Sequence, residues 1–364
     1  LRAGVGKTTL SLLTNPEALP YRGEDYELVL LHYFKALNYL SLGKQEAALV
    51  EARRLDIRLR EINGGYRAHK NRYGRDAFAL MLSGWLYDAA GEYNDAFIAY
   101  RNAYDAYREV YAVHFSIEPP EQLKRDLLRA AARSGLDEER AYYADRFGIS
   151  ESVETSSPAA RPAPGFAPVP GSDRGPDGEV VLLWHTGLGP VKDEWSLNFL
   201  VVRGQGGLVT FVNREQGLSF PFAVGSGSEG AGLEDLRAVR VAFPRFLTRS
   251  PRFTSATATV GGREQRLEPA QDINAIALAT LHDRMVRELS VALLRVALKQ
   301  ATEAVVRRQN ENLAALLSLT NAVTERADTR NWQTVPGRVA FARLALPAGE
   351  HTIRLRIDGR AGGE

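Results

Sequence analysis

The sequence predicts a two-domain protein of mixed class: an all-α helical-repeat domain followed by an antiparallel β-sandwich-like domain that carries a long helical insertion. Residues 75–110 have the apolar spacing of two short helices folded against each other around Gly91. A segment rich in Pro, Ala, Ser and Gly follows at 150–178. Beyond it, the apolar period shortens from about 3.6 to about 2 residues, the period of strands.

The helical pattern combines small and bulky residues at fixed positions around a glycine turn. After Gly91, side chains recur at steps of three and four; these are Tyr93, Ala96, Tyr100 and Ala103. Gly84 and Tyr87 precede the turn, so small residues meet bulky ones where the two helices touch. This is the tetratricopeptide pattern of an antiparallel helix pair, and it predicts that Ala96 lies at a close helix contact.

A second copy of the motif follows Gly43, where Ala48, Ala52 and Leu55 stand at the offsets that Ala96, Tyr100 and Ala103 have after Gly91. A third, weaker pair is predicted around Gly135. Three such pairs are about the minimum for stacked repeats to bury a continuous core. We therefore assign residues 1–149 to a tetratricopeptide-like domain.

Aromatic side chains in this domain suggest a surface for a protein partner. The candidate partner-binding residues here are Tyr87, Tyr100, Tyr104 and Tyr107. Tyr104 and Tyr107 are expected to be the most exposed of them. At helical spacing, the same residues also fit packing between helices, so both interpretations stay open.

The second half of the chain divides into a linker, strands and a helical insertion. Residues 150–178 are predicted to be an extended linker, because their composition buries little apolar surface. Residues 179–364 form the sandwich-like domain, closing with a hairpin of strands 337–346 and 351–357. The insertion at 270–327 is predicted to be two helices divided near 309–312, with Asp272 at the cap, covering one face of a sheet. The alternative is an exposed apolar face for self-association or for contact with a membrane surface.

Several classes of function are not supported by the sequence. The net charge of +2 comes without a clustered basic run, so we expect no nucleic-acid partner. Residues 1–10 end like a phosphate-binding loop, but Leu1 stands where that loop needs glycine, so no nucleotide is expected. The chain has no cysteine and no histidine spacing typical of a metal site. We predict no metal, no cofactor and no catalytic residue.

Two local sets of polar residues stay as candidates for a site. His185 and the following loop, with Lys192, Asp193 and Glu194, offer a base, a cation and carboxylates, although no known catalytic spacing is matched. Asp328, Arg330 and Trp332 follow the helical insertion. These three could hold a partner or ligand, or they could fix a chain reversal through an ion pair and a buried indole.

Three stretches carry a resemblance to a known family. They are 22–54 (RGEDYELVLLHYFKALNYLSLGKQEAALVEARR), 184–192 (WHTGLGPVK) and 327–336 (ADTRNWQTVP). Together they resemble an uncharacterised family of Gram-negative envelope lipoproteins with tetratricopeptide-like repeats. The resemblance implies a periplasmic protein, held at the outer membrane by a lipid on a cysteine upstream of Leu1, and acting near regulators of cell-wall synthesis. The family carries no established activity, so it implies no functional residue.

The sequence therefore predicts a non-catalytic adaptor or scaffold of the bacterial cell envelope, binding a protein partner through its helical repeats. The alternative is an envelope enzyme of unknown reaction with a site near His185 or near Asp328 and Arg330. The absence of any recognisable nucleophile, metal or phosphate constellation favours the adaptor.

Overall fold

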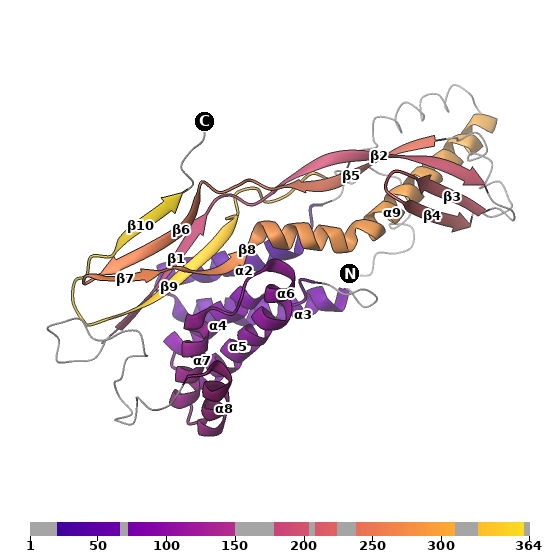
Figure 1. Ribbon diagram of the computed structural model, residues 1–364. Coiled ribbons are helices and arrows are strands. Elements are labelled where there is room, and N and C mark those ends of the chain that lie inside the picture. Colours follow the sequence, from indigo (N-terminus) through magenta and orange to yellow (C-terminus); the bar gives the residue numbers. More distant parts are fainter. Residues whose placement is uncertain are drawn as a thin grey trace. The chain divides into compact units, whose positions relative to one another are not determined.

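The computed structural model describes residues 20–65, 72–149, 178–203, 208–223, 238–309 and 327–359. Three predictions concern residues outside these ranges: the loop at 1–10, the linker at 150–178 apart from Gly178, and the second helix of the insertion beyond Gln309. Within the described ranges, helices occupy the N-terminal half and antiparallel sheets the C-terminal half (Figure 1). The mixed class predicted from the sequence is confirmed.

The chain folds into two compact units that alternate along the sequence. The first, called here the helix-sheet unit, comprises 24–190, 248–280 and 332–364. The second, the insert unit, comprises 1–23, 191–247 and 281–331. This division differs from the sequential one predicted at 150–178, because helices and several C-terminal strands share one compact unit. Each unit is described by itself.

The helix-sheet unit contains three helical hairpins. They are α2 (Asp25–Ser41) with α3 (Gln45–Gly65), α4 (Ala77–Ala89) with α5 (Tyr93–Ala106), and α7 (Glu121–Arg133) with α8 (Asp137–Phe147). Each hairpin turns at a predicted glycine, and Gly43, Gly91 and Gly135 have φ angles of 68°, 78° and 69°. Glycine is favoured there because side chains with a Cβ rarely adopt the left-handed region.

The contact between α4 and α5 confirms the predicted meeting of small and bulky residues. Gly84 faces the ring of Tyr100, and a Cβ on Gly84 would lie 2.9 Å from the Tyr100 Cζ. Tyr100 and Ala96 are both completely buried. The register read from the sequence therefore places the right residues between these two helices.

Helix α5 continues into a segment that the sequence pattern did not predict. A π-helical turn, η2 (Tyr107–Tyr111), leads into the short helix α6 (Ala112–Phe115). The rings of Tyr107, Tyr111 and Phe115 stack edge to face at centroid distances of 5.1 Å, and all three are buried. These residues are four apart, so their side chains lie on the same side of the helix.

Two three-stranded antiparallel sheets complete the helix-sheet unit. One has the order β1 (Gly178–Thr186), β9 (Arg338–Leu346), β8 (Glu268–Asp272), and the other β10 (Arg354–Gly359), β6 (Phe253–Val260), β7 (Arg263–Arg266). They share one apolar core, in which Ala342 and Leu344 of β9 pack with Ala256 and Ala258 of β6. Helices lie along the other face of the first sheet (Figure 1).

The predicted final hairpin is wrong. Strands β9 and β10 lie on either side of the turn at 347–349, but β9 pairs with β1 and β8, whereas β10 pairs with β6. The turn at 347–349 therefore carries the chain from one sheet to the other. The sequence also missed β8, which occupies the first residues of the predicted insertion, so the helix begins only at Ile273. Asp272 caps it by accepting a bond from the Ala275 backbone N–H (2.9 Å).

The insert unit is a four-stranded antiparallel sheet with a helix packed on one face. The strand order is β4 (Leu218–Ala223), β3 (Leu208–Asn213), β2 (Val191–Arg203), β5 (Ala238–Leu247). Helix α9 (Ile273–Gln309) belongs to this unit from Leu281 onward and packs Leu289, Leu293 and Val296 on the sheet. The prediction that the insertion covers one face of a sheet is confirmed for α9.

Candidate functional site

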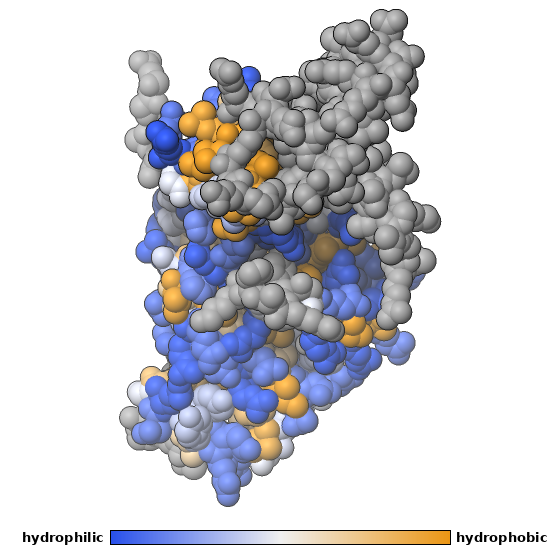
Figure 2. Space-filling view, turned by 90° about the vertical axis from the view of Figure 1, so that its right-hand side faces the viewer, coloured by the Kyte–Doolittle hydropathy of each residue, from blue (hydrophilic) through white to orange (hydrophobic). Residues whose placement is uncertain are grey.

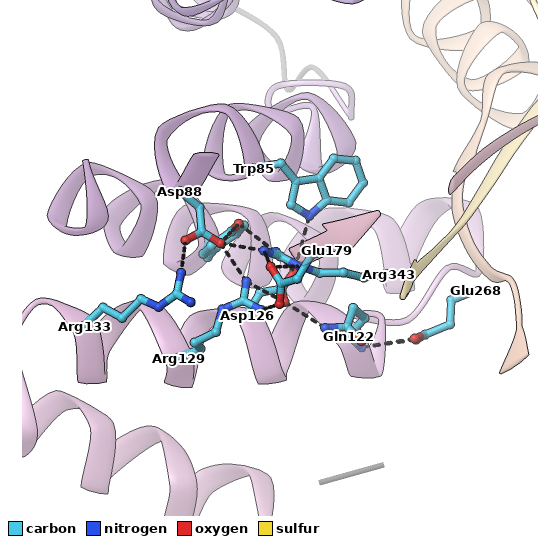
Figure 3. Close-up of polar contacts among 10 residues, drawn as sticks. Trp85, Asp88, Gln122, Asp126, Arg129, Arg133, Glu179, Glu268 and Arg343 are labelled. Carbon is cyan, nitrogen blue, oxygen red and sulfur yellow. Dashed lines mark hydrogen bonds and ion pairs between the residues drawn. The ribbon is translucent and has the colours of Figure 1, made fainter. Parts of the chain in front are cut away.

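Charged side chains gather where α4 and α7 meet strands β1 and β9. We call it the arginine-carboxylate network; it comprises Asp88, Asp126, Arg129, Arg133, Glu179 and Arg343 (Figure 3). Arg343 extends from β9 and binds Asp88 at 2.8 Å and Asp126 at 3.2 Å. It also binds Glu179 of β1. One guanidinium therefore joins two helices to the sheet.

A second guanidinium contacts the same carboxylates from the helix side. Arg129 of α7 binds Asp88 at 2.7 Å, Asp126 at 3.2 Å and Glu179 at 2.8 Å. Arg133, one turn further along α7, binds Asp88 at 3.0 Å. The three carboxylates are thus matched by three guanidiniums, which leaves the network without net charge.

The central side chains of the network are buried. The side chains of Asp88 and Asp126 are 2% and 0% exposed, and that of Arg343 is 8% exposed. Burial by itself would raise the pKa of Asp88, but the guanidiniums of Arg129 and Arg343 hold it below its ordinary value. The carboxylates of Asp88 and Asp126 are therefore engaged by arginine, which leaves neither free to act as a general base or to bind a metal.

Aromatic packing surrounds the network. The Trp85 indole N–H donates to Asp126 at 3.3 Å, and its ring lies against Phe341 of β9 with a centroid distance of 5.0 Å. Gln122 donates its side-chain amide to the other oxygen of Asp126 at 2.8 Å. The site is a packed junction between α4, α7 and β9.

Strand β8 forms further polar contacts with the helices, through three of its residues. The Glu268 carboxylate accepts the backbone N–H groups of Glu121 (2.5 Å) and Gln122 (3.1 Å), and so caps α7, whose own preceding residue, Pro120, supplies no side-chain cap. The Ala270 carbonyl accepts the Tyr107 hydroxyl at 2.8 Å. Strand β8, more than a hundred residues further along the chain, thus supplies hydrogen-bond acceptors that these helices lack.

Asp76 connects β8 to α4 in the same way. It is the N-cap of α4 and accepts the Ala79 backbone N–H at 2.8 Å. Gln271 of β8 donates its side-chain amide to the same carboxylate at 3.0 Å, and the Tyr73 hydroxyl also donates to it. Burial raises the pKa of Asp76 despite these donors. The carboxylate serves as an acceptor that three segments share.

The tyrosines predicted to bind a partner are mostly buried. Tyr100 and Tyr107 are 0% exposed and Tyr104 is 7% exposed, so the expectation that Tyr104 and Tyr107 are the exposed members is corrected. Tyr100 packs against Gly84, Tyr107 against Tyr111, and Tyr104 against Phe147. These bulky rings fill the space between helices instead of lining a surface. Tyr87 alone is half-buried, with the guanidinium of Arg53 6.0 Å from its ring centroid.

In the insert unit, Asp328 and Arg330 bind each other. The guanidinium donates to both carboxylate oxygens at 2.8 and 2.9 Å, and the Arg330 backbone N–H donates to the same carboxylate at 3.1 Å. Burial raises the pKa of Asp328, but the bonds from Arg330 outweigh it and lower the pKa overall. Nearby, Glu194 of β2 accepts the Ala327 backbone N–H at 2.7 Å. The geometry fits the local chain reversal that the sequence left open.

In the helix-sheet unit, Trp332 and His185 both contact Phe34 of α2. The ring centroids of Trp332 and His185 each lie 5.7 Å from that of Phe34. The Trp332 backbone N–H donates to the Glu27 carboxylate at 2.7 Å. His185 Nε2 lies 2.6 Å from the Tyr33 hydroxyl, and partial burial lowers the pKa of His185. Trp332 and His185 thus hold β1 and the segment before β9 against α2.

Replacing His185 by Gln is expected to make the stability of the protein fall less steeply as the pH is lowered below neutrality. Because the folded-state pKa lies below the ordinary value near 6.5, His185 stabilises the fold above that pH, and its contribution is lost as pH falls from about 6.5 toward the lowered pKa. Protonation also removes the acceptor for the Tyr33 hydroxyl. Melting temperatures at several values between about pH 7.5 and 5 should fall less steeply in His185→Gln than in the parent.

The control for this titration is His114→Gln, because His114 is exposed on α6. It shows what the same substitution does to the profile at an exposed position. Equal slopes for His185→Gln and the parent would mean that His185 titrates normally in the folded protein.

Within the described ranges, no three His, Asp or Glu side chains gather closely enough to hold a metal ion. The helices of these ranges include none with both the length and the apolar character needed to span a membrane. An open depression of about 230 Å³ is lined by Arg125, Arg263, Arg266, Glu264 and Glu268, among others, and contains neither His185 nor Asp328.

Comparison with protein-family models, with curated protein sequences and with solved structures finds no match to this chain. Its function must therefore be argued from its own residues.

Proposed function

We propose that this protein is a non-catalytic adaptor of the bacterial cell envelope that holds a protein partner on tetratricopeptide-like helical hairpins. The envelope location, with a lipid anchor at the outer membrane and regulators of cell-wall synthesis as partners, rests on the sequence resemblance. The β-strands of the helix-sheet unit, a small sandwich of two sheets, serve in this proposal as a support for the helices.

The proposal rests on a difference between the two helices of each hairpin: the first helix faces the chain's own strands, and the second faces solvent. The first helices, α2, α4 and α7, direct Phe34, Trp85 and Arg129 toward β1, β9 and the segment before β9. In a tetratricopeptide array, the first helices would line the usual peptide groove. Here the chain's own strands occupy that side, so a partner has to bind elsewhere.

The second helices, α3, α5 and α8, present apolar side chains to solvent. Val50 and Ile57 of α3 are 41% and 50% exposed, Ile98 of α5 is 37% exposed and Tyr142 of α8 is 57% exposed. Figure 2 shows a surface that is mostly hydrophilic, with hydrophobic residues in separate groups. Covering these apolar side chains on binding would favour association, with the surrounding polar residues as the rim. We therefore place the partner on α3, α5 and α8, with Tyr87 near their rim.

The proposed site residues of the alternative enzyme are engaged in contacts that fix the backbone. Asp328 is paired with Arg330, and His185 lies against Tyr33 and Phe34.

Site-specific photocrosslinking in cells of the source bacterium tests the adaptor. A photoreactive phenylalanine at Ile57, Ile98 or Tyr142 is expected to yield the same adduct with one envelope protein, and the additional change Val50→Glu should abolish it. The matched control is a photoreactive residue at Arg240, an exposed position on β5 of the insert unit, which should not give that adduct. Adducts that are equally abundant from Arg240, or unaffected by Val50→Glu, would contradict the proposal.

A further inference from the structure

The two sheets of the helix-sheet unit have one closed side and one open side. Strands β7 and β8 are separated only by Leu267, which is buried and donates its backbone N–H to the Ala256 carbonyl at 2.9 Å. This short connection closes the core on the side of β7 and β8. The other edge strand is β1 in the sheet that contains β8, and β10 in the sheet that contains β7. Strand β1 also contacts β6 of the other sheet. The open side is therefore bounded by β1 and β10.

Apolar side chains on this open side point toward the core but are only half covered. Leu355 and Ile357 of β10 are in register with Ala258 and Ala256, which are completely buried. Directly opposed residues of an antiparallel pair share one face. Leu355 and Ile357 nevertheless stay 38% and 41% exposed, and so does Val180 of β1, at 38%. The core is thus missing a cover along β10.

The backbone of β10 is also free to pair. Among the described strands, β10 has one neighbour, β6, and all six of its residues are exposed. The outer edge of such a strand presents unpaired N–H and C=O groups, to which a further strand can bond. Strand β10 therefore combines half-covered apolar side chains with an unpaired backbone edge.

The charge on the other face of β10 restricts what can add there. Arg354 and Arg356 alternate with Leu355 and Ile357, so they point away from the core. Arg356 binds the exposed Glu264 of β7 at 3.1 Å and lies 3.9 Å from Asp358, which shares its face of β10. Arg354 forms no ion pair within the described residues and is the arginine that a partner can neutralise. A strand that carries acidic side chains on this face would complement Arg354, and one that carries lysine or arginine would be repelled.

We propose that β10 binds an extended segment of a partner protein in which apolar and acidic residues alternate. The segment would add to the sheet as a further strand, with its apolar residues over Leu355 and Ile357 and its acidic residues beside Arg354 and Arg356. This surface is distinct from the outer helix faces of α3, α5 and α8. The inference goes beyond the adaptor proposal, and each can fail without the other.

A labelled synthetic peptide of alternating valine and glutamate, added to the whole chain, tests the inference by fluorescence anisotropy. The matched probe has lysine in place of every glutamate, which preserves the apolar face and reverses the charge. We expect the glutamate peptide to bind at least about tenfold more tightly than the lysine peptide at low ionic strength. Hydrogen exchange should slow in residues 354–359 when the glutamate peptide is bound.

Arg354→Glu should remove that preference, and because Arg354 is exposed, the substitution leaves the fold intact. Arg266→Glu is the control, because Arg266 is exposed on β7, the opposite edge of the same sheet, and should leave both affinities unchanged. Three results would overturn the inference: equal binding of the two peptides, equal loss in the two variants, or self-association of the chain through β10 without peptide binding. In the last case a second copy, not a partner, is the occupant.

Discussion

Replacing Arg343 by Met is expected to lower the free energy of unfolding by about 3–5 kcal/mol. Methionine keeps much of the length and apolar body of the side chain but removes the charge that Asp88, Asp126 and Glu179 share. Arg129 and Arg133 would remain, so two cations would face three carboxylates, of which Asp88 and Asp126 are almost completely buried. Urea denaturation followed by circular dichroism measures the loss.

Arg356→Met is the matched control. Arg356 lies on a strand of the same unit and is also ion-paired, but its side chain is 60% exposed and its partner Glu264 is 55% exposed. Its replacement should cost about 0–1 kcal/mol, the range of surface ion pairs. If Arg343→Met proved no more costly than Arg356→Met, the network would contribute little to holding the helices on the sheet.

Gly84→Ala is expected to destabilise the protein by about 1–3 kcal/mol, although alanine is the better helix former. The new methyl group would overlap the Tyr100 ring, with the Cζ 2.9 Å away. Tyr100 has no room to retreat, because it is completely buried and its hydroxyl lies 3.4 Å from Asp88. Thermal or urea unfolding of the variant measures the cost.

The control is Gly64→Ala in α3, where nothing lies within 4 Å of the added carbon. There the helix propensity of alanine should act alone and stabilise by up to about 1 kcal/mol. A Tyr100→Leu background should shrink the penalty of Gly84→Ala, because the ring that the methyl group overlaps is gone. Penalties that simply add in the double variant would show that Tyr100 is not the cause.

Local signals in the sequence predicted the parts of the fold that depend on near neighbours. The glycine turns at Gly43, Gly91 and Gly135 and the Gly84 to Tyr100 contact follow from backbone conformation and helical spacing. Strands were found by their alternation, yet their partners were not, because pairing depends on which faces bury together. Strand β9 was therefore paired with β10 instead of with β1 and β8.

The arginine-carboxylate network was missed for a related reason. Asp88 and Arg343 are 255 residues apart, and a charged residue within an alternating strand normally faces solvent. One signal was present: residues 339–346 (VAFARLAL) are apolar on both faces apart from Arg343, which is typical of a strand covered on both sides. A lone arginine in such a run needs a buried acidic partner, which would have pointed to Asp88 or Asp126.

The separation of Arg343 from Asp88 also has a consequence during translation. At about 5–20 residues per second, a ribosome needs roughly 10–50 s to synthesise the chain between them. For that time the carboxylates of the nascent helices lack the guanidinium from β9. For a shorter part of it, α7 also lacks the carboxylate of Glu268 at its N-terminus. The helical hairpins emerge first but reach their final packing last, once β8 and β9 have left the ribosome. A stop codon just before β9 should therefore yield nascent helices that bind chaperones instead of a stable truncated domain.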